Sequence, residues 1–360
     1  MAACVARIFH EHIGGNEVVS AYHTLATLSE NRADTPAGLR SMYNRRRMDR
    51  RSFLTLLSSS LLAASRRLPA HKNVKWALSA NLWNHLKPVA FTDILDVMRD
   101  TGFIGIRMTQ FPGILQKYGM TAAQLEAELS KRNLHVATIS FGGPAHDPGQ
   151  QAKLLEDARK AMEFLASFGA DRLVVFSPSR RPPETRTEAA FRTMCQTFNR
   201  IGELAGEKGF RAGLHNHLGQ MCEKPEEIDR CMRMTDAKLF GFSPDTAHLH
   251  LGGSNVVEMF QKYKNRLVMM DYKDAKWTAP PAGFSDANGT VPSAEEARFL
   301  SSIYDLGDGE IDFPGCHRIL KEIGYRGWNC VDLDAARKGP RASYERCGDY
   351  VVGKLEPIYS

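Results

Sequence analysis

The feature that most constrains the fold is a regular alternation of short apolar runs and helix-like segments that begins near residue 74. The runs are rich in Val, Ile, Leu and Phe and are too short for typical helices, so each predicts a buried strand. A strand that is followed by a helix and then by another strand is typical of a parallel sheet. The predicted strands are residues 74–80, 105–109, 135–141, 172–176, 210–215, 239–243, 267–272 and 328–333.

The segments between the runs carry apolar residues at helical spacing, and several of them stop at a glycine. The predicted helices are residues 91–101, 121–133, 151–168, 187–208, 224–234, 256–263, 313–323 and 341–354. Eight such units in about 290 residues predict a (β/α)8 TIM barrel rather than an open sheet. Residues 275–306 interrupt the pattern and are expected to form a long irregular loop.

The basic charge of the chain is confined to its N-terminal part. The chain has 47 Lys and Arg, 41 Asp and Glu, and a formal net charge of +6. Residues 1–72 hold 11 of the basic and 5 of the acidic residues, so residues 73–360 are neutral. We therefore expect a leader of residues 1–72 outside a barrel of residues 73–360. A neutral barrel does not suit nucleic-acid binding, which needs a basic working face.

The leader contains a pattern typical of a twin-arginine export signal, predicted over residues 48–70. Arg50 and Arg51 precede an apolar run at residues 54–64, and small residues follow near Ala70. The signal would send the protein to the periplasm; without it the protein would stay in the cytoplasm. The run is too short to span a bilayer, so no stable membrane insertion is expected. A basic tail with one amphipathic helix is the alternative, and residues 1–47 are outside the coding region if Met48 is the true start.

Polar side chains gather where the last four predicted strands end, and barrel enzymes build their active sites at such ends. Any one of these residues alone would more often cap a helix or make an ordinary hydrogen bond. Their recurrence at four equivalent positions favours a functional site. Imidazole and carboxylate groups suit Mn, Mg, Co or Zn. The predicted metal ligands are His215, Asp245, Asp271 and Asp332.

Three further side chains are candidates for binding substrate hydroxyls or moving protons: His217, His248 and Lys273. A metal beside them would polarise a carbonyl or hydroxyl oxygen. Other loops offer less specific signals. Arg180, Arg181 and Arg186 follow the fourth strand and either grip an anion or form a solvated loop. Trp277 and Phe284 could stack on a sugar ring.

Residues 243–249, 264–274 and 306–334 resemble the sugar phosphate isomerase/epimerase family, whose members have a xylose-isomerase-like TIM barrel. The resemblance covers roughly residues 74–355 and implies a metal-dependent isomerase or epimerase acting on a small sugar, keto-sugar or polyol. It also implies four ligands, namely Glu, Asp, His and Glu, from strands five to eight. Asp245 and His248 are kept, whereas the other three ligand positions hold His215, Asp271 and Asp332. The paired glutamates of the epimerases are thus missing.

Several functional alternatives remain open at this stage. Residues 215–219 resemble the inosose dehydratase branch, which implies a lyase that removes water beside a ketone, or eliminates a substituent from a 3-keto-glycoside. A non-catalytic sugar-binding barrel is a second alternative, although each substituted position still offers a metal-competent donor. A DNA-repair endonuclease of the related barrel type is disfavoured by the neutral barrel. The sequence leaves the oligomeric state open.

Overall fold

Eight parallel strands form one curved sheet in the computed structural model, which describes residues 66–360 apart from 110 and 287–288. Each strand pairs in parallel with its neighbours, in the order β6-β5-β4-β3-β2-β1-β10-β7. The strands are β1 (Val74–Ser79), β2 (Gly105–Met108), β3 (His135–Phe141), β4 (Arg172–Phe176), β5 (Arg211–His215), β6 (Phe240–Phe242), β7 (Met270–Tyr272) and β10 (Gly327–Val331).

The two edges of this sheet meet, so the sheet closes on itself. Isolated parallel bridges join Phe242 to Leu267 and Asp245 to Asp271 across the gap between β6 and β7. The Val268 N–H donates to the Phe242 carbonyl at 2.9 Å, which continues the pairing at the base of the same gap. The predicted TIM barrel is therefore confirmed, and its last closure places the ends of β6 and β7 side by side.

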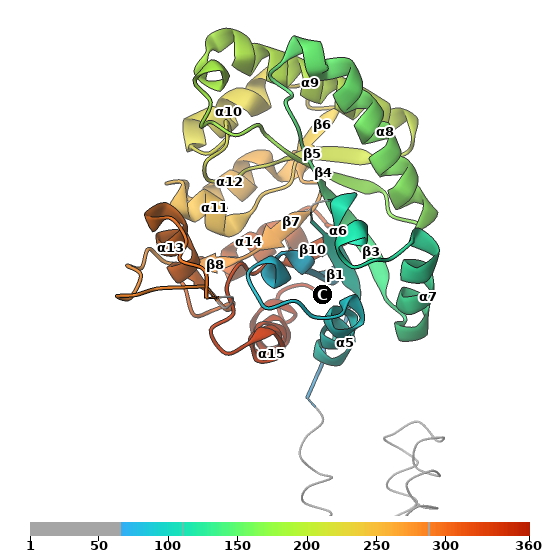
Figure 1. Cartoon of the computed structure of the whole chain (residues 1–360), viewed down its shortest axis with the longest axis vertical. Helices are drawn as coiled ribbons and strands as arrows, with labels where there is room; N and C mark the ends of the chain where they lie inside the picture. Colours follow the sequence, from blue (N-terminus) through green and yellow to red (C-terminus); the bar gives the residue numbers. More distant parts are fainter. Residues whose placement is uncertain (1–65, 110, 287–288) are drawn as a thin grey trace, which may run out of the picture. The chain divides into compact units, whose positions relative to one another are not determined.

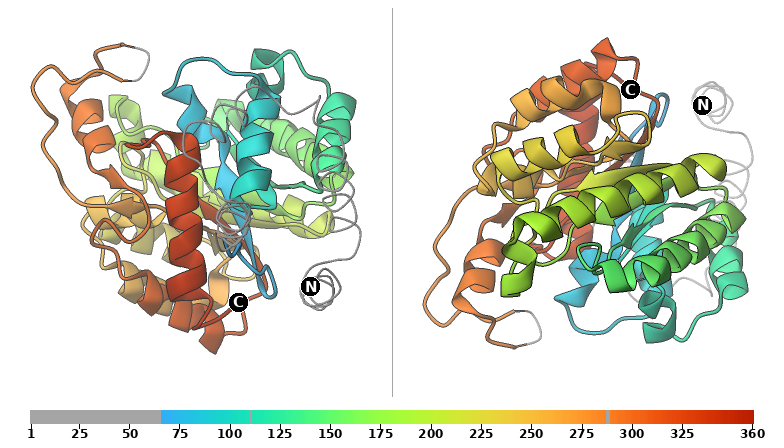
Figure 2. Two further views of the ribbon diagram at one scale, coloured as in Figure 1. Left: turned by 90° about the horizontal axis from the view of Figure 1, so that it is seen from below. Right: turned by 90° about the horizontal axis from the view of Figure 1, so that it is seen from above.

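Helices surround the strands on the outside, as the ribbon in Figure 1 shows. The last of them lies beside the first elements of the barrel (Figure 2), where the Tyr344 hydroxyl donates to the Ser79 carbonyl at 3.1 Å. The helices are α5 (Phe91–Thr101), α6 (Gly113–Lys117), α7 (Ala122–Arg132), α8 (Gln151–Ser167), α9 (Glu188–Glu207), α10 (Pro225–Met234), α11 (Thr246–Leu251), α12 (Val256–Tyr263), α13 (Ala294–Ser301), α14 (Phe313–Glu322) and α15 (Pro340–Tyr350).

Local sequence signals explain where these helices begin and end. Thr121 and Gln124 form a reciprocal capping box at the start of α7. The same helix ends at Asn133, which has a φ of 55°, a left-handed conformation that Asn tolerates better than most residues. Helix α5 ends at Gly102 with a φ of 84°. Such signals lie within a few residues of each helix end, which is why most of the barrel helices could be predicted from the sequence.

The barrel has an inner core that is separate from the large core between strands and helices. Because successive strand residues point to opposite faces, Cys330 packs inside while its neighbour Val331 packs outside. Gly105 lies directly against the ring of Trp328, and any β-carbon there would collide with that ring. The buried members of the inner core are Ala77, Ala137, Val174, Met269, Trp328 and Cys330. This apolar plug fills the barrel below the rim.

The segment expected to be an irregular loop is partly ordered, so that prediction was wrong. Strands β8 (Asp274–Ala275) and β9 (Ile303–Tyr304) pair in an antiparallel ribbon that encloses α13. The Ser293 hydroxyl caps α13 by accepting the Glu296 N–H. The short helices α6 and α11 were also not predicted, because one or two turns carry too little periodicity to be recognised. The β8–β9 excursion brings α13 to the rim of the barrel.

The N-terminal end of the described chain is attached to the barrel. Arg67 forms an ion pair with Glu356 at 3.0 Å, and the Ala70 N–H donates to the same carboxylate. Nε2 of His71 donates to the Gly102 carbonyl at 2.8 Å. The predicted export signal lies outside the described residues except for its last five positions, and the division into leader and barrel stays a prediction. No described helix is long and apolar enough to cross a membrane.

Candidate active site

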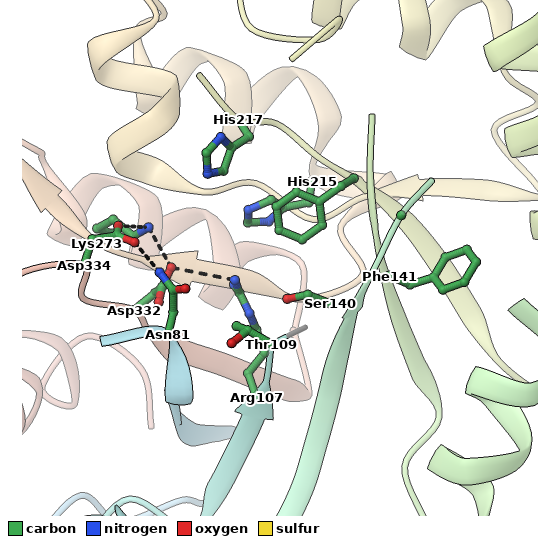
Figure 3. Close-up of a pocket in the computed structure, with 12 residues that line it drawn as sticks. Asn81, Arg107, Thr109, Ser140, Phe141, His215, His217, Lys273, Asp332 and Asp334 are labelled. Carbon is green, nitrogen blue, oxygen red and sulfur yellow. Dashed lines mark hydrogen bonds and ion pairs between the residues drawn. The ribbon is translucent and has the colours of Figure 1, made fainter. Parts of the chain in front are cut away.

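A pocket of about 260 Å³ opens at the C-terminal ends of the strands (Figure 3). Its volume is slightly below the usual range for ligand pockets, about 300 to 1,000 Å³, and suits a single small molecule. His215, His217, Lys273 and Asp332 line it, as the strand-end argument predicted. The other lining residues are Asn81, Arg107, Thr109, Ser140, Phe141, Gly142, Phe176 and Asp334.

Three of the four predicted metal ligands come together beside this pocket. One donor atom from each of His215, Asp245 and Asp271 lies within 4.8 Å of the others. Nδ1 of His215 is 3.2 Å from Oδ2 of Asp271, and its Nε2 is 3.9 Å from Oδ2 of Asp245. All three side chains are buried. The two imidazole nitrogens and the two carboxylate oxygens make no hydrogen bond, although Asp271 is ion-paired with Arg107 and Asp245 with Lys273. The donor chemistry therefore fits a small divalent cation.

Local structure explains how Asp245 reaches this position. One of its carboxylate oxygens accepts the His248 N–H at 3.1 Å and so caps the short helix α11. The second oxygen is left to face Lys273, His215 and His248. Thr246 fixes the next strand, because its hydroxyl donates to the Lys273 carbonyl at 2.8 Å and accepts the Lys273 N–H at 2.9 Å. The ends of β6 and β7 are thereby held in register.

The fourth predicted ligand, Asp332, lies against two cations and not within the group of three. Its Oδ2 is 2.7 Å from the Lys273 ammonium and 3.8 Å from the Arg107 guanidinium. Burial alone would raise the pKa of Asp332, but these two cations outweigh it and hold that pKa well below its usual range. Asp332 therefore stays a carboxylate that binds the two cations, and its role as a metal ligand stays a prediction.

Lys273 is the centre of a buried ion-pair network. Its ammonium is 3.1 Å from Asp245, 2.7 Å from Asp332 and 2.6 Å from Asp334. Burial alone would lower the pKa of Lys273, but the three carboxylates outweigh it and raise that pKa well above its usual value. Lys273 is therefore a fixed cation near neutral pH. It can donate hydrogen bonds and stabilise negative charge, but it is not available as a base.

The rings of the two candidate histidines lie in contact, with centroids 3.7 Å apart and planes tilted by 34°. The backbone of Leu218 fixes both tautomers: its carbonyl accepts from Nδ1 of His217 at 2.7 Å, and its N–H donates to Nδ1 of His248 at 3.4 Å. Nε2 of His217 is thus left without a proton and is free to accept one. Burial lowers the pKa of His217 to about 3, helped by nearby His215, and lowers that of His248 as well. Both rings are neutral at pH 7.

Sequence reasoning missed several parts of the site. Arg107 is one of them, because its partners Asp271 and Asp332 follow it by more than 160 residues and no local pattern links them. Asp334, which pairs with Lys273 at 2.6 Å, is another. Phe299 of α13 was not considered, yet its ring stacks on His248 at 5.1 Å. No local sequence signal links Phe299 to the rim, because its position depends on the β8–β9 excursion.

The structure also bears on two less specific predictions, which concern the aromatic residues and the arginines of the loops. Neither Trp277 nor Phe284 lines the pocket; Trp277 is 42% exposed and packs against the Arg298 guanidinium. Arg180 pairs with two carboxylates near the start of α10, Glu223 at 3.3 Å and Glu227 at 2.9 Å. The guanidinium of Arg186 donates to backbone carbonyls of its own loop. These contacts favour the solvated-loop interpretation of the arginines over an anion grip.

Comparison with known proteins places this barrel in a family. The family model for the xylose isomerase-like TIM barrel matches residues 95–346, so the chain belongs to that family. It is 28% identical over 222 residues to the inosose dehydratase of Bacillus velezensis, covering 58% of this chain and 72% of the relative.

Two solved structures share the fold at low identity. One is the IOLI protein with a bound zinc atom, with a TM-score of 0.62, 13% identity, and coverage of 80% of this chain and 100% of that one. The other is the 3-keto-D-glucoside 4-epimerase of E. coli, with a TM-score of 0.57, 14% identity, and coverage of 78% and 99%. At these identities the likeness establishes the fold, and the chemistry must be argued from the site.

Proposed function

We propose that this chain is a metal-dependent lyase that removes water beside the ketone of a small keto-sugar or inosose. The observation that carries this proposal is the imidazole pair of His217 and His248, whose neutral rings lie together beside the pocket. The similarity to an inosose dehydratase supports the same reaction class. The proposal chooses the lyase among the alternatives that the sequence left open.

Different residues would bind the metal ion, accept the proton and carry the fixed charges in such an elimination. His215, Asp245 and Asp271 would hold the divalent ion, and the presence of zinc in the IOLI protein of similar fold supports a metal in this barrel. When bound, such an ion would polarise the C=O bond of a neighbouring ketone, which makes the carbonyl carbon more electrophilic and the α-hydrogens more acidic. Nε2 of His217 is the acceptor for the α-proton. Lys273 and Arg107 are fixed cations beside the pocket that hold Asp245, Asp271 and Asp332 in place.

The bond changes balance with these groups alone. His217 takes the proton from the carbon beside the ketone, and that electron pair forms the carbon–carbon double bond. The hydroxyl on the next carbon leaves with its bonding electrons and receives a proton from the His217 imidazolium, so that water departs and His217 returns to its neutral form. One base on one side of the substrate is enough for this sequence.

Epimerisation remains the second candidate, because carboxylates lie across the pocket from His217 (Figure 3). An epimerase must return the proton to the opposite face, which requires a second group that can carry it. Asp332 occupies that side, but its pKa is held well below its usual range by Lys273 and Arg107 despite its burial. The elimination needs one proton-carrying group on one side of the substrate, whereas the epimerisation needs a second one, which is why the elimination is preferred.

The test is to measure metal content and turnover together on the full chain. The protein is incubated, with and without chelator, with a panel of ketoses, aldoses, inososes and 3-keto-glucosides, and products are followed by NMR. We expect chelator-sensitive loss of water from a ketone, and a loss of at least ~100-fold in kcat/KM for His217→Gln. A product with the same formula as the substrate would identify an isomerase or epimerase instead. A folded protein without metal or turnover would favour a binding module.

We also propose that the twin-arginine pattern at Arg50 and Arg51 directs export. The test compares the cellular location of the wild-type chain with that of a variant carrying Arg50→Lys and Arg51→Lys. Retention of the variant in the cytoplasm, with the wild type outside it, would support the proposal. Equal distribution of the two proteins would contradict it.

A further inference from the structure

The charges around the pocket decide which substrates it can accept. Two cationic side chains line it, Arg107 and Lys273, and both are almost fully buried. A phosphate or carboxylate group of a substrate is normally bound by arginine or lysine donors that point at it. Whether this pocket can hold an anionic sugar therefore depends on whether these two cations have donors to spare.

Both cations are already committed to carboxylates of the protein. Lys273 lies within 3.1 Å of three of them, Asp245, Asp332 and Asp334. The terminal nitrogens of Arg107 face Asp271 and Asp332. Nε and Nη1 of Arg107 make no hydrogen bond, so N–H groups remain for an uncharged substrate oxygen, whereas the guanidinium charge is already matched by Asp271 and Asp332.

The charge balance of this network is negative. The network contains two cations, Lys273 and Arg107, and four carboxylates. The negative charges therefore exceed the positive charges by two; the carboxylates are Asp245, Asp271, Asp332 and Asp334. A divalent ion at the predicted metal site would cancel this excess without making the site positive. The pocket therefore has no net positive charge to attract an anion, with or without the metal.

Asp334 holds the part of this network that faces the substrate. It lines the pocket, and its two oxygens are used by different partners: Oδ2 by the Lys273 ammonium and Oδ1 by the Asn81 amide. Asn81 and Asp334 come from opposite ends of the barrel sequence, after β1 and after β10. The Asn81 amide and the Asp334 carboxylate form a polar wall that offers both donor and acceptor groups, which matches hydroxyl groups.

We infer that Asp334 is a specificity-determining residue that restricts this pocket to uncharged keto-sugars and keto-polyols and excludes their phosphorylated and carboxylated forms. The inference rests on the proposed function, whose substrate class it narrows. It also implies the class of reaction that must supply the substrate: oxidation of a secondary hydroxyl of a neutral sugar or polyol to a ketone, without prior phosphorylation.

The first experiment measures binding, so that it does not depend on turnover. Calorimetry compares D-glucitol with D-gluconate, which differ by one carboxylate on the same carbon chain, using the full chain with and without added Mn²⁺. The wild type should bind glucitol at least ~10-fold more tightly than gluconate, because an added negative charge meets a network without a free cation. Equal or tighter binding of gluconate would overturn the inference.

The second experiment changes the specificity. Asp334→Asn removes one negative charge, leaves Lys273 held by Asp245 and Asp332, and should lower the preference for the neutral ligand by ~10-fold. Asp157→Asn on the outer face of α8 is the matched control, because it makes the same charge change at an exposed site. An unchanged preference in Asp334→Asn, or an equal change in both variants, would overturn the assignment to Asp334.

Turnover separates this inference from the proposed function. Ketoses and 3-keto-glucosides are compared with their phosphate esters, and the ratio of kcat/KM values should favour the neutral member of each pair. Faster turnover of the phosphate esters would overturn the inference while leaving the lyase intact. An absence of turnover with every ketone would contradict the proposed function, whereas the binding ratio would still decide the charge preference.

Discussion

Replacing Lys273 by Met tests the buried ion-pair network most directly. The substitution keeps an unbranched side chain one atom shorter and removes an ammonium that lies 2.6 to 3.1 Å from three carboxylates. Removing one partner of a buried ion pair costs about 3 to 5 kcal/mol, because the remaining charge stays buried and unpaired. Lys273 has three such partners, so we expect a loss of at least about 3 kcal/mol in the free energy of unfolding at pH 7.5.

The assay is urea denaturation in the presence of chelator, with Lys153→Met on the outer face of α8 as the control. Lys153 pairs with Asp157 but is 71% exposed, so its loss should cost less than about 1 kcal/mol. Without the ammonium, the buried carboxylates gain protons more easily, so their folded-state pKa values rise above the unfolded ones. The destabilisation should therefore shrink from pH 7.5 to pH 5.

The double variant Lys273→Met with Asp334→Asn removes one of the unpaired carboxylates. It should recover part of the lost stability, since the coupling between contacting residues makes their effects non-additive. A loss below about 1 kcal/mol for Lys273→Met, or one equal to that of the Lys153 control, would refute the reasoning. In that case the network would contribute no net electrostatic stabilisation to the fold.

Three other predictions follow from single sites. Asp245→Ala should abolish stoichiometric binding of Mn²⁺, measured by elemental analysis after dialysis; unchanged metal content would exclude the proposed site. Burial lowers the pKa of His317 to about 4, whereas an unfolded histidine has a pKa of about 6.5. The neutral His317 ring therefore stabilises the fold fully above pH 6.5, and this contribution is lost as the pH falls toward 4. The loss should reach about 3 kcal/mol by urea denaturation and should be smaller in His317→Gln; equal pH slopes would contradict this. Gly105→Ala should lower stability by about 1 to 3 kcal/mol, because its β-carbon would collide with Trp328, and an unchanged melting temperature would show that the ring can move aside.

The barrel could be predicted from the sequence because its signals are local. Each strand and most helices carry their own periodicity, and turn residues such as Gly102 mark where they end. The segment between β7 and α14 could not be predicted in this way. Its strands are only two residues long, and they exist because each pairs with the other across α13.

The location of the site was also predictable, but its charge pairing was not. Parallel strands end at one edge, so His or Asp at successive strand ends must meet, as His215, Asp245 and Asp271 do. Which cation pairs with which carboxylate depends on distances across the barrel. Arg107 on β2 reaches Asp271 on β7 over the apolar plug, and no spacing along the chain encodes that contact.

The same geometry explains why Asp332 is separated from the other predicted ligands. A carboxylate at the end of β10 lies between the cations of β2 and β7, and an aspartate is one methylene shorter than the glutamate of the family pattern. Once Lys273 is buried, it needs nearby carboxylates to remain charged, and Asp332 and Asp334 supply two of them. The substitution of Glu by Asp and the arginine on β2 are therefore parts of one arrangement. Asp332 and Arg107 depend on each other. A short carboxylate that lies beside two fixed cations stabilises their charges and is poorly suited to carry a proton.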